Sequence, residues 1–151
     1  MVMASTLLVA SGVAWAVTKT CPPAPKQCKG TSGADVLKST SKDNNMVGKG
    51  GNDTYTNFAR GNSGVDFILD SGGKDKLLLT NYSTHTYQAL DYVNNNGKAD
   101  TLAIYLDPKG TKKLKNAVVI LYFFDDKKSI PNKPKTWVAG PGFVELIKFK
   151  K

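Results

Sequence analysis

The chain has 151 residues, of which 40% are hydrophobic and 22% charged, and its 21 Lys and Arg against 12 Asp and Glu give a net charge of +9. This length suits one domain, or one domain with a small appendage. The sequence lacks the motifs of zinc proteases, serine hydrolases and P-loop proteins, and nothing around its single histidine, His85, would orient that side chain for catalysis. We therefore do not expect an enzyme.

The N-terminal residues have the composition of an export signal. Residues 2–18 carry no charge and include an apolar run from Leu7 to Trp15. The sequence Ala14-Trp15-Ala16 fits the small-x-small rule for cleavage of secretory signal peptides. The alternative is an uncleaved membrane anchor, but the apolar stretch is shorter than the roughly 20 residues that span a bilayer. We expect residues 1–16 to be a signal peptide cleaved near Ala16, which leaves no transmembrane segment.

The two cysteines of the chain, Cys21 and Cys28, follow this signal directly. An even number of cysteines in an exported protein indicates disulfide bonding, here one bridge. Two cysteines alone cannot form a structural zinc site, which needs four ligands. We expect residues 17–29 to form a cap, bridged by Cys21 and Cys28, over the open end of the fold, which would otherwise expose an unpaired edge.

Residues 30–78 contain a repeated unit of nine residues. In four copies, a glycine stands two residues before an aspartate and an apolar or aromatic residue stands two residues after it. These copies are Gly33-x-Asp35-x-Leu37, Gly51-x-Asp53-x-Tyr55, Gly64-x-Asp66-x-Ile68 and Gly73-x-Asp75-x-Leu77. A degenerate copy has Asn44 and Met46, and residues 57–60 interrupt the period. Ordinary turns between strands are the alternative, but four copies in register favour a true repeat.

Such a unit predicts a glycine-rich turn of six residues followed by a strand of three. Glycines permit the positive φ angles of tight turns, and a hard cation such as calcium takes 6–8 oxygen ligands from carboxylates and carbonyl groups. The apolar residue would point inward, so we expect calcium outside and a thin aliphatic core inside. The predicted calcium-binding residues are Gly33, Asp35, Asn44, Gly51, Asp53, Gly64, Asp66, Gly73 and Asp75.

These units closely resemble the G-G-x-G-x-D-x-U-x repeat of secreted bacterial hemolysin-type (RTX) calcium-binding proteins. The resemblance covers residues 30–78 and implies a short parallel β-roll in which units two apart stack on the same side. Asp35, Asp53 and Asp75 would then share one side, whereas Asn44 and Asp66 would share the other. A cysteine pair directly before a calcium repeat is also similar to an arrangement found in exported bacterial proteins.

After residue 78 the pattern changes to strands with longer connections. The candidate strands are residues 77–79, 89–93, 101–106, 117–124 and 143–149. We expect residues 79–151 to form an antiparallel β-rich segment, similar to the β-rich tail that follows calcium rolls in secreted proteins. Asp91 and Asp100 are nine residues apart, but neither has a glycine two residues earlier. We expect them to be strand or turn residues and not a sixth metal unit.

The positive charge is concentrated in this C-terminal segment, which has twelve Lys against five Asp and one Glu. Its lysines gather in residues 109–115 and 127–135, which are either solvated loops or a surface for anionic cell-envelope polymers. We expect no specific nucleic acid, because Tyr122, Phe123 and Phe124 fit a core strand better than a base-stacking platform.

Together these patterns predict a secreted, all-β, calcium-binding protein that folds on export and presents a basic surface. The alternatives are a binding module for anionic polymers with purely structural calcium, or the tail of a secreted enzyme.

Overall fold

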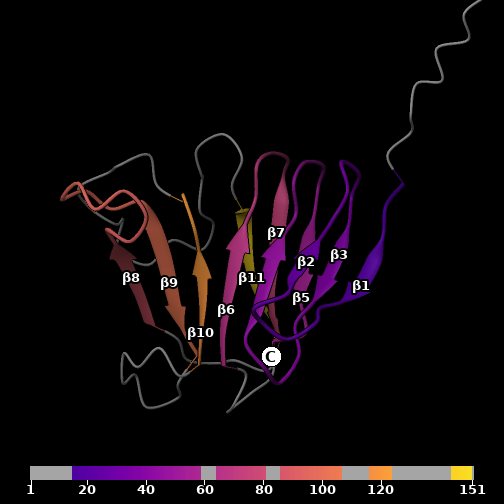
Figure 1. The fold of residues 1–151 in the computed structure, drawn as a ribbon, viewed down its shortest axis with the longest axis horizontal. Coiled ribbons are helices and arrows are strands. Elements are labelled where there is room, and N and C mark those ends of the chain that lie inside the picture. The colour runs from indigo at the N-terminus through magenta and orange to yellow at the C-terminus, as the bar shows by residue number, and fades with distance from the viewer. Residues whose placement is uncertain (1–14, 59–63, 81–85, 107–115, 124–143, 151) are drawn as a thin grey trace, which may run out of the picture.

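The computed structural model of the chain describes residues 15–58, 64–80, 86–106, 116–123 and 144–150. The described residues form β-strands and no helix, so the predicted all-β class is confirmed. The strands make two sheets that enclose a common core (Figure 1). One sheet has the order β1 (Thr18–Thr20), β3 (Val36–Lys38), β5 (Thr54–Thr56), β7 (Asp75–Thr80) and β11 (Val144–Lys150). The other has the order β2 (Gln27–Lys29), β4 (Asn44–Val47), β6 (Gly64–Leu69), β10 (Asn116–Ile120), β9 (Thr101–Tyr105) and β8 (Thr86–Leu90).

From β1 to β7 the chain alternates between the two sheets, and neighbouring strands within each sheet are parallel. Val36 pairs with Thr54, 18 residues later, which is twice the nine-residue unit. Across the interruption at residues 57–60 the separation grows by four, so that Thr54 pairs with Lys76. The four extra residues therefore leave the strand register intact.

The apolar position of each unit points into the space between the sheets, as strand alternation predicts. Its members are buried and belong to one core cluster: Leu37, Met46, Tyr55, Ile68 and Leu77. The inner faces of β9 and β10 extend this core with Leu102, Ile104, Val118 and Ile120. Burial of one such aliphatic side chain stabilises a fold by about 1.5–3 kcal/mol. The hydrophobic core thus runs through the repeat region and into the C-terminal strands.

The C-terminal strands differ in part from the antiparallel segment that the sequence predicts. β8, β9 and β10 are antiparallel to one another, as expected. β10, however, joins the first seven strands in parallel with β6, and β11 lies parallel to β7. Parallel neighbours require a crossover of a dozen or more residues, and the chain provides 46 residues (70–115) between β6 and β10 and 63 residues (81–143) between β7 and β11. Residues after 78 therefore lengthen both existing sheets and do not form a separate antiparallel unit.

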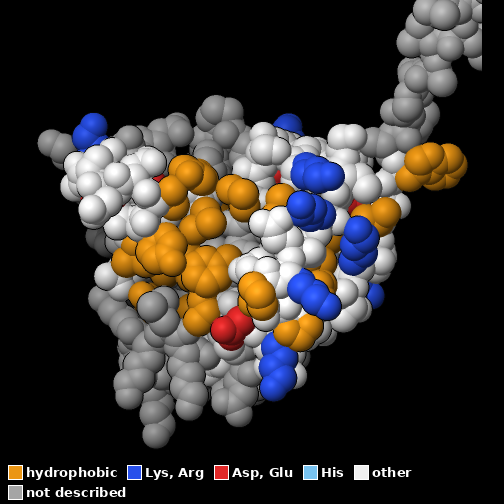
Figure 2. Space-filling model, viewed as in Figure 1, with side chains coloured by type: hydrophobic (Ala, Val, Ile, Leu, Met, Phe, Trp, Pro, Cys, Tyr) orange, Lys and Arg blue, Asp and Glu red, His pale blue; other side chains and the backbone are white. Residues whose placement is uncertain are grey.

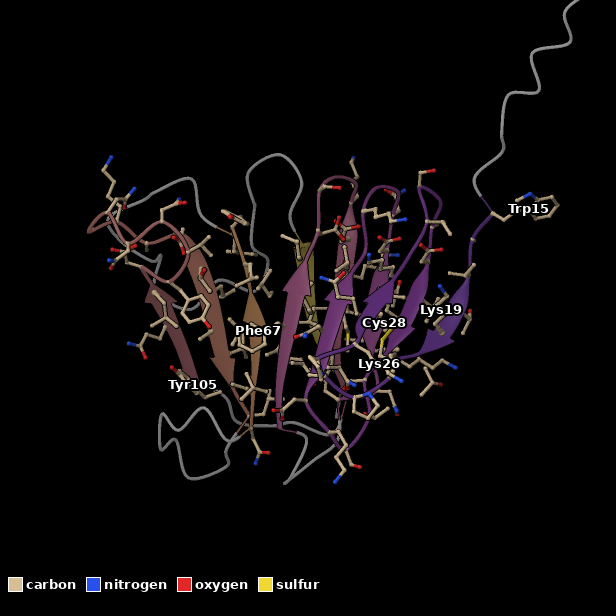
Figure 3. All side chains as sticks on the ribbon, in the orientation of Figure 1. Trp15, Lys19, Lys26, Cys28, Phe67 and Tyr105 are labelled. Atoms are coloured by element: carbon tan, nitrogen blue, oxygen red, sulfur yellow. A yellow bond between two sulfur atoms is a disulfide. The ribbon has the colours of Figure 1, made fainter. Side chains whose placement is uncertain are left out.

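The N-terminal end of the core carries the predicted disulfide, Cys21–Cys28. Cys21 follows β1 in one sheet, whereas Cys28 lies in β2 of the other, so the bridge joins the first strands of both sheets. Both cysteines are buried in the core cluster. Lys19 is in register with Leu37 in the neighbouring strand, at the start of the inward-facing column. Its Nζ donates a 2.7 Å hydrogen bond to the carbonyl oxygen of Lys29, across the end of the core (Figure 3).

A second apolar cluster covers the outer face of β6 and β8–β10 (Figure 2). It is built on Ala103, Tyr105, Ala117 and Val119, with Phe67 and Leu90 packed against them. The Phe67 ring stacks on Tyr92 with 6.1 Å between ring centroids. These strands consequently have apolar side chains on both faces.

Several sequence predictions fall outside the described residues. They are the signal peptide up to residue 14, His85, Phe124 and the two lysine clusters of residues 109–115 and 127–135. Among the residues that are described, no helix has the length and apolar character to cross a membrane.

Candidate metal centre

Three of the predicted aspartates stack in successive turns, at the N-terminal ends of parallel strands. Asp35 directly precedes β3, Asp53 directly precedes β5, and Asp75 begins β7; all three are buried. The backbone N–H of Asp35 donates to Oδ1 of Asp53 at 2.8 Å, and the N–H of Asp53 donates to Oδ1 of Asp75 at 2.8 Å. We call these three residues the carboxylate row. Each carboxylate in it ties one turn to the next.

The carboxylate row lies on the core side of the strands, which corrects the expectation of metal ligands outside the core. The reason is the spacing of the repeat itself. Asp35 and Leu37 are two residues apart, and side chains two apart on an extended strand point to the same face. Leu37 is fully buried, and Asp35 is only 1% exposed. The aspartate and the apolar residue of one unit therefore share the interior.

The glycines that precede the row allow successive turns to stack in close contact. Gly51 has φ of +104° and Gly73 has φ of +131°, a region that L-residues rarely adopt. A Cβ on Gly51 would collide with the carbonyl oxygen of Gly33, and a Cβ on Gly73 would collide with that of Gly51. Glycine is thus required at both positions. Its absence of a side chain lets backbone carbonyl groups approach the neighbouring turn two residues before the carboxylates.

The opposite side of the fold contains the second predicted row, in which Asn44 pairs with Asp66. The Asn44 N–H donates to Oδ1 of Asp66 at 3.0 Å, and the Ser39 hydroxyl donates to Oδ2 at 2.8 Å. Both carboxylate oxygens of Asp66 thus have protein donors. Burial nevertheless raises the pKa of Asp66 to about 7, against the lowering effect of these hydrogen bonds. Gly64, with φ of +72°, packs against Asp43 in the neighbouring turn.

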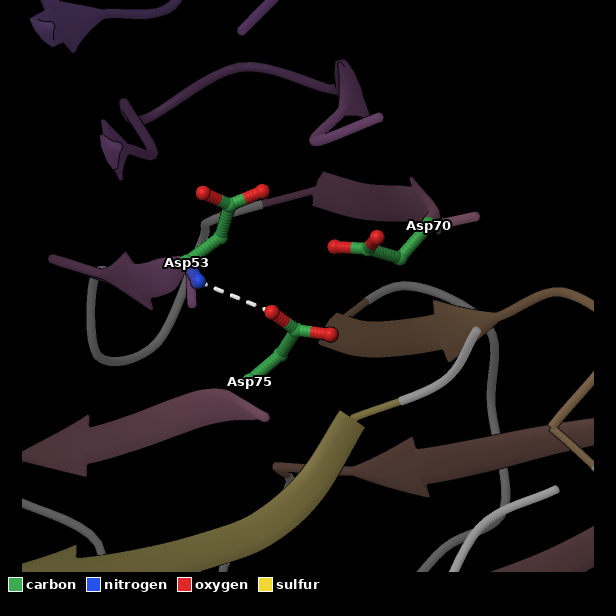
Figure 4. Close-up of side chains that lie close together, drawn as sticks. All are labelled: Asp53, Asp70 and Asp75. Atoms are coloured by element: carbon green, nitrogen blue, oxygen red, sulfur yellow. Dashed lines mark hydrogen bonds between the residues drawn. The ribbon is translucent and has the colours of Figure 1, made fainter. Parts of the chain in front are cut away.

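The carboxylate row is joined by Asp70, which is not among the calcium-binding residues predicted from the sequence. Asp70, which follows β6, is buried with Asp53 and Asp75, and one carboxylate oxygen from each lies within 4.8 Å of the others (Figure 4). The Tyr55 hydroxyl donates a hydrogen bond to Oδ2 of Asp70, and the Gly72 N–H donates to Oδ1 at 3.1 Å. Oδ2 of Asp53 is buried and has no hydrogen-bond partner among the described residues.

Burial makes negative charge costly in this group of three carboxylates. Desolvation raises the pKa of Asp53 to about 6, although the hydrogen bond from the Asp35 N–H opposes it, and the charge of Asp70 raises it further. Burial also raises the pKa of Asp70 above its usual value, against the hydrogen bonds from Tyr55 and Gly72. Buried like charges favour protonation unless a cation neutralises them. The group therefore has the oxygen donors and the charge to hold a metal ion.

A positional signal for Asp70 was present in the sequence. Asp70 occupies the first position of its nine-residue unit, where Gly30 and Gly48 begin other units. A Cβ on Gly48 would collide with Oδ2 of both Asp70 and Asp53, so this glycine leaves the space that the carboxylates fill. The repeat predicts Tyr55 in the core, as observed, but the pattern does not reveal that its hydroxyl donates to Asp70.

Asp91 and Asp100 are turn residues, as predicted. The Asp91 carboxylate accepts hydrogen bonds from the N–H groups of Asn96 and Gly97, at 3.1 and 2.6 Å. Asp100 accepts N–H donors from residues 92–94 and the Thr101 hydroxyl. Although burial opposes the effect, these bonds lower the pKa of Asp100. The two carboxylates organise one loop.

No protein-family model, curated protein or solved structure matches the chain. The disulfide points to a location outside the cytoplasm, where thiols are not kept reduced, and Asp53, Asp70 and Asp75 form a group that could hold a metal ion.

Proposed function

We propose that the protein is a secreted calcium-binding protein of the hemolysin-type (RTX) repeat class, whose Asp and Gly turns bind Ca²⁺ and fold on export. The observation that carries this proposal is Asp53, the middle member of the carboxylate row. Its Oδ2 is buried without a hydrogen-bond partner among the described residues, beside two more buried carboxylates. An unpaired buried charge costs several kcal/mol. A bound cation would remove that cost.

The donor set fits calcium. All side-chain donors in the group are oxygens, which hard cations prefer, and the stacked glycine turns add backbone carbonyl oxygens, which calcium accepts readily. In the proposed roll, Asp35 and Asp53 hold one ion together, and Asp53 and Asp75 hold a second. Asn44 and Asp66 form the weaker site, because Asn44 supplies no charge and fewer negative ligands weaken calcium sites.

Calcium also provides a reason for folding after export. Three buried carboxylates disfavour the folded state when calcium is scarce, as it is inside a cell. Outside the cell, an ion that binds only the folded chain stabilises it by RT ln(1+[L]/Kd), about 2.7 kcal/mol at a hundredfold excess over Kd. The disulfide is consistent with the same destination. The proposal includes no catalytic role.

Thermal unfolding of the exported chain tests this proposal. Circular dichroism melts would be compared in chelator, in millimolar calcium and in millimolar magnesium, and calorimetry would give the calcium stoichiometry. We expect calcium to raise the melting temperature and increase the β-signal well beyond magnesium. Identical melts in chelator and in calcium, with no heat of calcium binding, would exclude the proposed function.

A second candidate function is binding of anionic cell-surface polymers, with calcium in a purely structural role. The distribution of charge favours it. Six of the eight described aspartates are buried, and several lysines line one face (Figure 2). The exposed lysines are Lys19, Lys26, Lys29, Lys42, Lys49, Lys74, Lys76 and Lys98. The described surface is therefore positive even though this part of the sequence contains many acidic residues. Calorimetry with a teichoic-type polymer and with DNA, in calcium, would test this function, and heat with DNA alone would contradict the polymer assignment.

A further inference from the structure

The first residue of a nine-residue unit points toward the aspartate row on its own side of the fold. Three positions demonstrate this. A Cβ on Gly30 would meet the Asp35 carboxylate, Ser39 donates to Asp66, and Asp70 lies against Asp53 and Asp75. The chemistry of each row therefore depends on which residue occupies this first position. Ser39 and Asp70 give the two sides of the fold opposite properties.

On the Ser39 side, the row is satisfied within the protein. It contains one carboxylate, Asp66, whose two oxygens accept hydrogen bonds from the Asn44 N–H and the Ser39 hydroxyl. The side-chain oxygen of Asn44 accepts the Thr40 N–H at 2.8 Å, and its Nδ2 donates to the Pro22 carbonyl oxygen at 2.9 Å. A single carboxylate with these donors does not require an ion.

On the Asp70 side, the equivalent position adds a charge. Asp53, Asp70 and Asp75 together bring three buried carboxylates to one place, and the structure gives Oδ2 of Asp53 no donor from the described residues. The Tyr55 hydroxyl lies beside Asp70 and donates a hydrogen bond to it, and the hydroxyl oxygen keeps a lone pair that could bind a cation. The absence of a side chain on Gly48 makes room for these groups, because a Cβ there would collide with the Tyr55 hydroxyl and with Oδ2 of both Asp53 and Asp70.

We propose that the ion assigned above to Asp53 and Asp75 is also bound by Asp70 and the Tyr55 hydroxyl, and that this cation site holds a hard divalent cation of the size of calcium between the two sheets. Asp70 follows β6 in one sheet, whereas Asp53 and Asp75 stand at the start of β5 and β7 in the other. The ion therefore links the sheets from inside. Calcium–oxygen distances of about 2.4 Å suit ligand oxygens that lie within 4.8 Å of one another.

This inference rests on the proposed calcium-binding function but makes a separate claim, because Asp70 and Tyr55 lie outside the Gly and Asp positions of the repeat. The exported chain would be compared with three variants. Asp70→Ser copies the Ser39 side of the fold, Tyr55→Phe removes only the hydroxyl, and Asp43→Ser removes an exposed carboxylate as a charge control. Calorimetry would give stoichiometry and Kd, and terbium emission sensitised by tyrosine would report an ion beside Tyr55.

We expect Asp70→Ser to lose one calcium per chain and to melt at a higher temperature than wild type in chelator, since a buried like charge is gone. Tyr55→Phe should keep the stoichiometry, weaken one site about tenfold, as loss of an oxygen ligand weakens calcium sites, and lose most of the terbium emission. Asp43→Ser should match wild type in stoichiometry and emission.

Two results separate this proposal from the proposed function. If wild type binds no calcium, both are wrong. If wild type binds calcium and folded Asp70→Ser has the same stoichiometry, Kd and terbium emission, the site proposed here is wrong and the calcium function stands. Circular dichroism would establish that Asp70→Ser folds. If it does not, Asp70→Asn, which keeps the shape of the side chain, replaces it with the same expected loss of one ion.

Discussion

The backbone N–H of Asp35 donates a 2.8 Å hydrogen bond to the carboxylate of Asp53, although 18 residues separate them in the chain. Asp53 repeats the same contact toward Asp75. Asp53 is consequently the one residue that links all three turns of the carboxylate row. Asp53 therefore connects more of the fold than the nine-residue unit around it shows.

Asp53→Ala should therefore lower calcium binding more than Asp66→Ala. Asp53 is a ligand of both of the proposed stronger calcium sites, whereas Asp66 is a ligand of the weaker site only. We expect Asp53→Ala to lose at least one calcium per chain and about 2–3 kcal/mol of calcium-dependent stability. Calorimetry and paired melts in calcium and chelator would measure this, and the difference between the two melts removes any loss common to both conditions. Equal losses in the two variants would mean that the assignment of strong and weak rows is wrong.

The metal-free chain should become less stable as the pH rises toward neutrality. The folded-state pKa of Asp66 is about 7 against a reference value of 3.8, because burial disfavours its charge. Between these two pH values the folded state therefore binds more protons than the unfolded state. The contribution of Asp66 to the stability of the fold is complete below pH 4 and is lost as the pH approaches 7. Denaturant unfolding in chelator across this range measures the slope.

Asp66→Asn is the matched control for this pH dependence, since the amide keeps an acceptor for the Asn44 N–H and cannot ionise. Its slope should be shallower than that of wild type. A smaller slope of the same sign should remain, because Asp53 and Asp70 also have raised pKa values. A wild-type chain whose stability rises with pH in chelator would contradict the prediction.

Gly51→Ala should destabilise the fold strongly, whereas Gly50→Ala should not. Gly51 has φ of +104°, and a Cβ there would collide with the Gly33 carbonyl, but a Cβ on the adjacent Gly50 meets nothing closer than 3.9 Å. Backbone strain alone costs about 1–3 kcal/mol at such a position, and the collision adds to it. Chemical denaturation in calcium would compare the two variants. If both lost the same stability, close stacking of the turns would not explain the glycine.

Mass spectrometry of the exported chain should show a start near Val17 and a mass lower by two hydrogens from the Cys21–Cys28 bridge. Loss of a bridge that closes so short a loop should cost about 2–3 kcal/mol. Replacing both cysteines by alanine and measuring denaturation tests this value. Two thiols that react without denaturant would contradict the bridge.

The sequence pattern predicted those parts of the fold that depend on local spacing. The period of nine predicted that Asp35 and Asp53 share one side and that Asn44 and Asp66 share the other, because strand alternation and turn length set the register. The same alternation also puts the aspartates inside, so the prediction of metal ligands outside the core was wrong. The first position of its unit marks Asp70, but its contact with the Tyr55 hydroxyl cannot be predicted from periodicity, because the two groups meet through packing between the sheets. The parallel direction of β11 depends on a long crossover, which no local pattern specifies.

Lys19 has a consequence for the assembly of several molecules. It occupies the first place in the inward-facing column, and its ammonium group crosses to the Lys29 carbonyl oxygen at the end of the core. A second copy that docked end to end on β1 and β2 would bury this charge without a carboxylate partner, which is strongly unfavourable. Inward-pointing charges are a known protection against pairing between sheet edges. Fibres built by adding molecules at this end are therefore disfavoured, and Lys19→Leu would remove that barrier.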